Sequence, residues 1–109
     1  MKPYDTEELE ILSQYHLRFY KRYLKKQSFY SDSLEVKEHD APFEKSYVYN
    51  IEQALDDLDH DERTIITHEN LENAPKNWWM DYYSKSTYYR IKQRAYKRFI
   101  DCLHSQTMV

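Results

Sequence analysis

Residues 84–104 read SKSTYYRIKQRAYKRFIDCLH. Apolar side chains recur in this stretch at the three- and four-residue spacing of a helix, and they form one stripe: Tyr88, Ile91, Ala95, Phe99 and Cys102. Ser84 suits the N-cap position, because its hydroxyl can accept a hydrogen bond from a backbone N–H of the first turn. The stretch therefore predicts an amphipathic helix over residues 85–104.

The opposite face of this helix is polar and mostly basic. A helix with such a face can enter the major groove of DNA, where its first side chains meet base edges and its later cations meet phosphates. The candidate DNA-binding residues are Lys85, Ser86, Thr87, Tyr89, Arg90, Gln93, Arg94, Lys97 and Arg98. Charge alone leaves a second interpretation open, in which these are ordinary solvated bases on a helix surface.

The distribution of charge supports a nucleic-acid partner more than the total does. The formal net charge of the 109-residue chain is −3. Residues 76–104 carry seven basic and two acidic side chains, whereas the rest of the chain carries nine basic and seventeen acidic ones. A basic segment beside an acidic remainder is typical of a protein with a localised anion-binding surface.

Composition predicts an all-α protein of one domain's size. The chain has no Gly and only 3 Pro, which disfavours the tight turns of β-rich folds and excludes Gly-rich phosphate loops. A single Cys excludes an internal disulfide and favours a cytoplasmic location. No apolar run approaches the roughly 20 residues of a membrane span, so no membrane partner is expected.

Periodicity divides the chain into three segments: an N-terminal amphipathic helix in residues 1–27, a connector over 28–49 and a helical domain over 50–109. The first helix is expected over residues 6–26, with a stripe of Leu9, Leu12, Tyr15 or His16, Phe19, Tyr23 and Leu24. It is long for so small a protein. It can project from the rest of the chain, or pair with a partner helix or a second copy.

Three short helices are expected before the last one. Asn50 can cap a helix over 51–58, and Asp59 followed by Glu62 forms a capping-box pattern for a helix over 59–71. Pro75 suits the first position of a helix over 75–82, which would hold one buried and one partly exposed Trp. One shared core is predicted from Ile51, Leu55, Leu58, Ile65, Ile66, Tyr88, Ile91, Ala95 and Phe99.

Four short motifs follow one another within this domain. They are LDDL at 55–58, ERTII at 62–66, SKST at 84–87 and RA at 94–95. In this order they resemble the C-terminal, promoter-reading helix-turn-helix of sigma-70-type factors (region 4). Residues 54–103, about half of the chain, are also similar to phage late-gene activators built on the same module. The resemblance implies a helix-turn-helix bundle that binds duplex DNA and contacts RNA polymerase.

The sequence departs from that family in the first helix of the helix-turn-helix. The family usually has an Ile-Ala-x-x-Leu-Gly-Val-like segment there, whereas residues 78–83 read WWMDYY. The angle between the two helices, and with it DNA docking, is left open by this difference. Residues 82–90, YYSKSTYYR, are also similar to an uncharacterised family of short mollicute proteins.

No enzymatic, cofactor or metal site is predicted. Six acids between residues 52 and 62 are spread over two helices and lack the Gly and the spacing of a calcium loop. The five His are scattered and match no zinc pattern with Cys102. Ser84 and Ser86 are better explained as a cap and a groove contact than as nucleophiles.

The sequence thus predicts an all-α, small DNA-binding transcription regulator with double-stranded DNA as its partner. RNA polymerase, or another protein on the N-terminal helix, is a further expected partner. Two other hypotheses remain open. One is a helical protein–protein adaptor that keeps the fold without sequence-specific DNA binding. The other is a phage packaging or terminase-like DNA binder.

Overall fold

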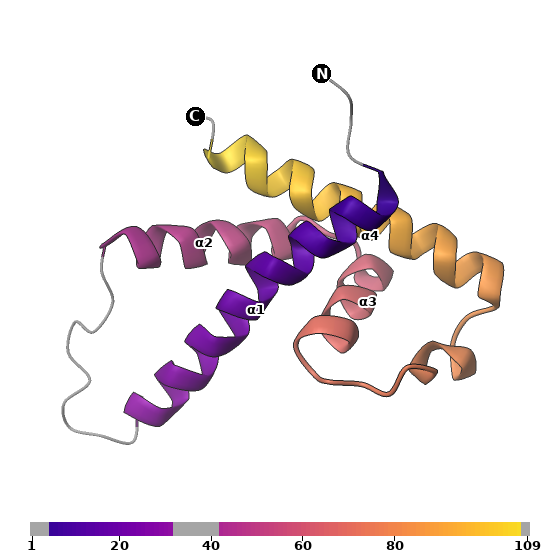
Figure 1. Ribbon diagram of the computed structural model, residues 1–109, viewed down its shortest axis with the longest axis horizontal. Coiled ribbons are helices and arrows are strands. Elements are labelled where there is room, and N and C mark those ends of the chain that lie inside the picture. Colours follow the sequence, from indigo (N-terminus) through magenta and orange to yellow (C-terminus); the bar gives the residue numbers. More distant parts are fainter. Residues whose placement is uncertain (1–4, 32–41, 108–109) are drawn as a thin grey trace.

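The computed structural model of the chain describes residues 5–31 and 42–107. It contains the helices α1 (Thr6–Ser31), α2 (Pro42–Asp56), α3 (His60–Asn70) and α4 (Lys85–Thr107), with a short 3-10 helix, η1 (Trp78–Asp81), before the last (Figure 1). Across these two ranges there is no strand. The all-α prediction is therefore confirmed.

Helix α4 is the central element of the fold, because each of the other three α-helices packs against it. In Figure 1 the start of α4 lies at the right beside η1, while the end of α1 and the start of α2 lie at the left. The two ends of the molecule are therefore built from different elements. No described helix is both long and apolar enough to cross a membrane.

Helix α1 does not project from the rest, since it packs on α2, α3 and α4. It also runs five residues beyond its predicted end, to Ser31. Its buried face differs from the predicted stripe: Tyr15 is 73% exposed, while Leu17 is fully buried. The buried positions follow the spacing Leu9, Ser13, Leu17 and Tyr20, which is one face of a helix. Leu12, Phe19 and Tyr23 flank this face and are only partly buried.

Helix α2 begins much earlier than predicted. Residues 42–49, predicted as the end of the connector, form its first two turns, so Asn50 lies inside the helix and is not a cap. Pro42 suits a helix start, because proline has no N–H to satisfy and its φ is already helical. Val48 lies one turn before Ile51 and is 4% exposed, which extends the same buried face backwards. The rest of the predicted connector lies outside the described residues.

Helix α3 has the predicted capping box. The Asp59 side chain accepts a hydrogen bond from the backbone N–H of Glu62 at 2.8 Å, and the Glu62 side chain accepts one from the N–H of Asp59 at 2.9 Å. The helix ends at Asn70, one residue before the predicted end. Asn73 then takes a left-handed conformation with φ 52°, which Asn tolerates better than most residues, and the chain turns back.

The helix predicted over 75–82 is wrong: the structure has only the four-residue η1 there. Its backbone hydrogen bonds join residues three apart, as from Met80 N–H to the carbonyl of Asn77 at 3.1 Å. The physical reason lies in Trp78, which is buried against His68 of α3 and Tyr88 of α4. Burying that ring fixes a tight turn where a regular helix was expected.

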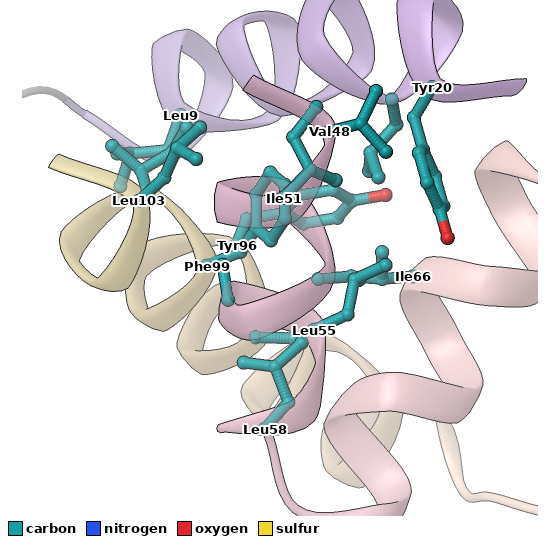
Figure 2. Packing of buried hydrophobic residues seen from close by; sticks show 14 residues of the cluster. Leu9, Tyr20, Val48, Ile51, Leu55, Leu58, Ile66, Tyr96, Phe99 and Leu103 are labelled. Atoms are coloured by element: carbon teal, nitrogen blue, oxygen red, sulfur yellow. The ribbon is translucent and has the colours of Figure 1, made fainter. Parts of the chain in front are cut away.

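The nine predicted core residues are all buried, but they do not share one core. The main cluster joins all four α-helices and includes Ile51, Leu55, Ile66, Ala95 and Phe99 (Figure 2). A second cluster beside η1 consists of Ile65, Trp78, Tyr88 and Ile91. The division follows from η1, which supplies its own buried Trp to the start of α4.

Replacing Phe99 by Ala tests this core. Phe99 is fully buried, so the substitution should lower the free energy of unfolding by about 3–5 kcal/mol in urea denaturation. Lys97→Ala, on the exposed side of the same helix, should change it by no more than about 0.5 kcal/mol. A loss of less than about 1 kcal/mol for Phe99→Ala would contradict the packing described.

Candidate nucleic-acid interface

The start of α4 is fixed by a side-chain cap. The backbone N–H of Thr87 donates to the Ser84 hydroxyl at 3.3 Å, and that hydroxyl donates to the Thr87 hydroxyl at 2.9 Å. The predicted Ser84 cap is confirmed. Thr87 is half-buried and occupied by this contact, so it supports the helix start more than it offers a free surface.

The first three turns of α4 carry the available part of the predicted site. Lys85, Ser86, Arg90 and Gln93 are exposed, and their side chains make no hydrogen bond or ion pair within the part of the chain that the structure describes. Tyr89 is 46% exposed and contacts Trp79 edge-on. These residues form one outward surface, which we call the α4 polar face.

The remaining predicted residues are already engaged inside the protein. Arg94 donates from Nε to a Glu62 oxygen at 2.8 Å and from Nη2 to Asp59 at 3.0 Å. Arg98 donates from Nη1 to the other Glu62 oxygen at 2.9 Å. Lys97 pairs with Asp101 one turn later, in an exposed contact of 2.8 Å. The structure thus separates the nine predicted residues into a free group and an engaged group.

Glu62 is the residue that organises the engaged group. Its side chain is 0% exposed, although a carboxylate is costly to bury without partners. Besides the two guanidinium groups it accepts the backbone N–H of Asp59, so both oxygens are satisfied. The hydrogen bond to Glu62 raises the pKa of Arg94. Glu62 therefore ties the start of α3 to the middle of α4.

A second acid, the partly buried Glu69, joins the same two helices nearer the start of α4. Glu69 accepts hydrogen bonds from the hydroxyls of Tyr88 and Tyr96, and burial raises the pKa of both tyrosines. Lys92 lies 3.5 Å from Glu69 and 3.2 Å from Glu10 of α1. Lys92 is consequently a bridge between α1 and α4, and it does not belong to the α4 polar face.

Aromatic rings line one side of the α4 polar face. Trp78 is buried and stacks on His68 with ring centroids 4.3 Å apart, whereas Trp79 is partly exposed and stacks on Tyr88 at 4.5 Å. The expected pattern of one buried and one partly exposed Trp is confirmed. A pocket of about 490 Å³ lies beside these rings, and its lining includes Glu10, Glu69 and Trp79.

The acidic stretch that ends α2 and starts α3 is largely occupied by internal contacts. Asp56 pairs with Arg63, and Asp61 accepts the Tyr83 hydroxyl at 2.8 Å. Burial and that hydrogen bond raise the pKa of Tyr83 to about 12. Within residues 5–31 and 42–107 no three His, Cys, Asp or Glu side chains group in a way that could hold a metal ion.

Sequence reasoning missed the roles of Glu62 and Glu69. The capping-box pattern correctly predicted that Glu62 points back to Asp59. However, the two arginines that meet it lie 32 and 36 positions further along the chain, and no local pattern links them. Comparisons of the chain with family models, with curated proteins and with solved structures find no match. The resemblance to sigma region 4 stays a prediction carried by its motifs.

Glu62→Gln tests the role of this buried carboxylate. The amide keeps the size of the side chain but removes the charge that the two half-exposed guanidinium groups face. The free energy of unfolding in urea should fall by roughly 2–4 kcal/mol. Asp101→Asn removes an exposed ion-pair partner of Lys97 and is the matched control, with an expected change of about 0–0.5 kcal/mol. Equal losses in the two variants would show that Glu62 does not organise the fold.

Proposed function

We propose that the protein is a small DNA-binding regulator whose α4 polar face enters the major groove of duplex DNA. The observation that carries this proposal is the set of exposed donors without internal partners at the start of α4: Lys85, Ser86, Arg90 and Gln93. Arginine, lysine and glutamine are side chains that contact base edges in the groove. An α-helix fits the groove's width of about 12 Å.

Helix electrostatics support the same end of α4. The unsatisfied N–H groups of a helix start carry partial positive charge, which favours phosphate groups. Lys85 and Lys76 add exposed cations near this end, against one exposed acid in η1, Asp81. Phosphate contacts are therefore expected here, and also from Lys97, whose ion pair with Asp101 is exposed.

The acids around Glu62 indicate which part of α4 would face DNA in the proposed complex. Asp57 and Asp59 are exposed near Arg98 and Arg94, where phosphates would be repelled. Duplex DNA is thus favoured at the first turns of the helix and disfavoured where these acids face Arg94 and Arg98. This revises the simple division expected from the sequence, in which Arg94 and Arg98 were ordinary phosphate contacts.

The adaptor function is the second candidate, and one specific observation favours it. Arg94, Lys97 and Arg98, which make up a third of the predicted DNA-binding residues, are ion-paired with acids of this same chain. Each such pair leaves less uncompensated charge for counterion release on DNA. An adaptor needs none of that charge, and it would keep the same helical core.

Binding titrations separate the two functions. A pool of randomised duplexes is first selected on the wild-type protein, and the selected duplex is then compared with a scrambled one at several salt concentrations. Arg90→Ala should weaken binding to the selected duplex by about 1–3 kcal/mol and relax preference at one base pair. Lys97→Ala should weaken both duplexes alike and lower the salt slope by about one ion.

Lys45→Ala is the matched control for these titrations, because it removes one exposed positive charge near the start of α2, which lies far from the start of α4 in Figure 1. It should leave the affinity for the selected duplex unchanged. If the wild-type protein binds no duplex even at low salt, the adaptor function replaces the regulator. If Arg90→Ala and Lys97→Ala weaken every duplex equally, the binding is electrostatic only and the sequence-reading function is wrong.

A further inference from the structure

A second uncommitted surface lies at the other end of the molecule, between α1 and α2. It is a groove of about 450 Å³ lined by Tyr15, Arg18, Phe19, Arg22, Phe43 and Tyr47, which we call the α1–α2 groove. Phe43 is 70% exposed and Tyr15 is 73% exposed. Two large exposed aromatic side chains thus lie beside one groove, and exposed apolar side chains grouped in this way mark a candidate interaction surface.

The charge around the groove is of one sign. No acid lines it, and residues 11–31 of α1 contain five bases and no acid at all. Arg18 and Arg22 are exposed, and neither makes an ion pair or side-chain hydrogen bond within residues 5–31 and 42–107. The groove thus combines an apolar interior with cations that have no ion-pair partner among the described residues.

We propose that the α1–α2 groove binds an acidic amphipathic helix of another protein. A groove between two helices is suited to a third helix, whose apolar side chains at i, i+3 or i+4 and i+7 enter it. One large apolar side chain would lie between Tyr15 and Phe43, while carboxylates beside it would meet Arg18 and Arg22. The positive charge of the groove requires a partner with carboxylates, and the exposed rings require that it insert a large apolar side chain.

The packing of Tyr47 favours a peptide over a single strand of nucleic acid. The Tyr47 ring lies 4.9 Å from the Phe19 ring and 5.7 Å from the His16 ring, measured between centroids. Tyr47 therefore does not add an open ring face to those of Tyr15 and Phe43, whereas a nucleic-acid strand stacks successive bases on a series of open ring faces. An inserted side chain needs only the gap between the outer rings.

Two acids of α2 are already engaged within the chain and so have little to offer the groove of a second copy. Glu52 accepts the Tyr20 hydroxyl at 3.0 Å, and Asp56 pairs with Arg63. A partner with free carboxylates fits the groove better. The proposal stands apart from DNA binding, because no residue of α4 lines this groove and Figure 1 shows the start of α4 at the right and the start of α2 at the left.

The test is the selection of helical peptides from a displayed library with no charge bias, using the full chain as bait. Peptides that also bind the Arg22→Glu, Phe43→Ser double variant are removed. The surviving peptides should be net acidic and carry a large apolar residue at helical spacing. Survivors without acidic bias, or no survivors at all, would overturn the proposal.

Affinities of one selected peptide then locate the site. Arg22→Glu should weaken binding about tenfold or more, because it reverses the charge of a side chain that lines the groove. Lys25→Glu makes the same change of charge one turn further along α1, outside the groove, and should weaken binding by less than about threefold at 150 mM salt. Both positions are exposed, and thermal unfolding followed by circular dichroism checks that each variant folds. Equal losses in the two variants would show attraction by overall charge without a groove.

Three other occupants give distinct results, and each would overturn the proposal. Displacement of the peptide by oligo-dT at equal concentration would indicate a nucleic-acid strand. A concentration-dependent dimer abolished by Phe43→Ser would indicate a second copy. Residues 32–41 carry four acids and one base. If a variant with these four acids neutralised binds peptide and the wild-type protein does not, the groove belongs to that segment of the same chain.

Discussion

The buried carboxylate of Glu62 is the constraint on which the rest of the arrangement depends. It lies at the first turn of α3 and receives Arg94 and Arg98 from α4 at 2.8 and 2.9 Å. Apolar packing alone allows two helices to slide or rotate against each other, because the hydrophobic effect has no direction. A fully buried acid that needs particular donors removes that freedom. The orientation of α4, and hence which of its residues face outward, follows from this one group.

The same interaction divides the basic side chains of α4 into two groups. Arg94 and Arg98 contribute to the fold, whereas Arg90 and Lys85 have no internal role and remain available to a partner. The charge of the chain is divided in a similar way at larger scale. Acids gather at the α2–α3 junction, and exposed cations without a described partner lie at the start of α4 and, on α1, at Arg18, Arg22 and Lys25. The exposed cations therefore lie on two separate elements, α1 and α4.

Local chemistry made much of this fold predictable. Asp59 with Glu62 and Ser84 with Thr87 are cap patterns whose geometry involves only neighbouring residues, and both were correctly predicted. Long-range requirements caused the errors. Burial of Trp78 replaced an expected helix by η1, and Tyr20 replaced Tyr15 on the buried face because its ring packs inward while its hydroxyl reaches Glu52. Of the candidate site, the residues were predictable as a face of α4, but their division into free and engaged groups was not.

Arginine side-chain exchange measures that division most directly. In ¹⁵N-labelled protein the Nε–H of Arg94, which donates to the buried Glu62, should exchange with water far more slowly than the Nε–H of the exposed Arg90. Addition of duplex DNA should shift the Arg90 signal and leave the Arg94 signal in place. Equal exchange rates for the two groups in the free protein would contradict the account, because Arg94 would then be as free as Arg90 and Glu62 would not hold α4.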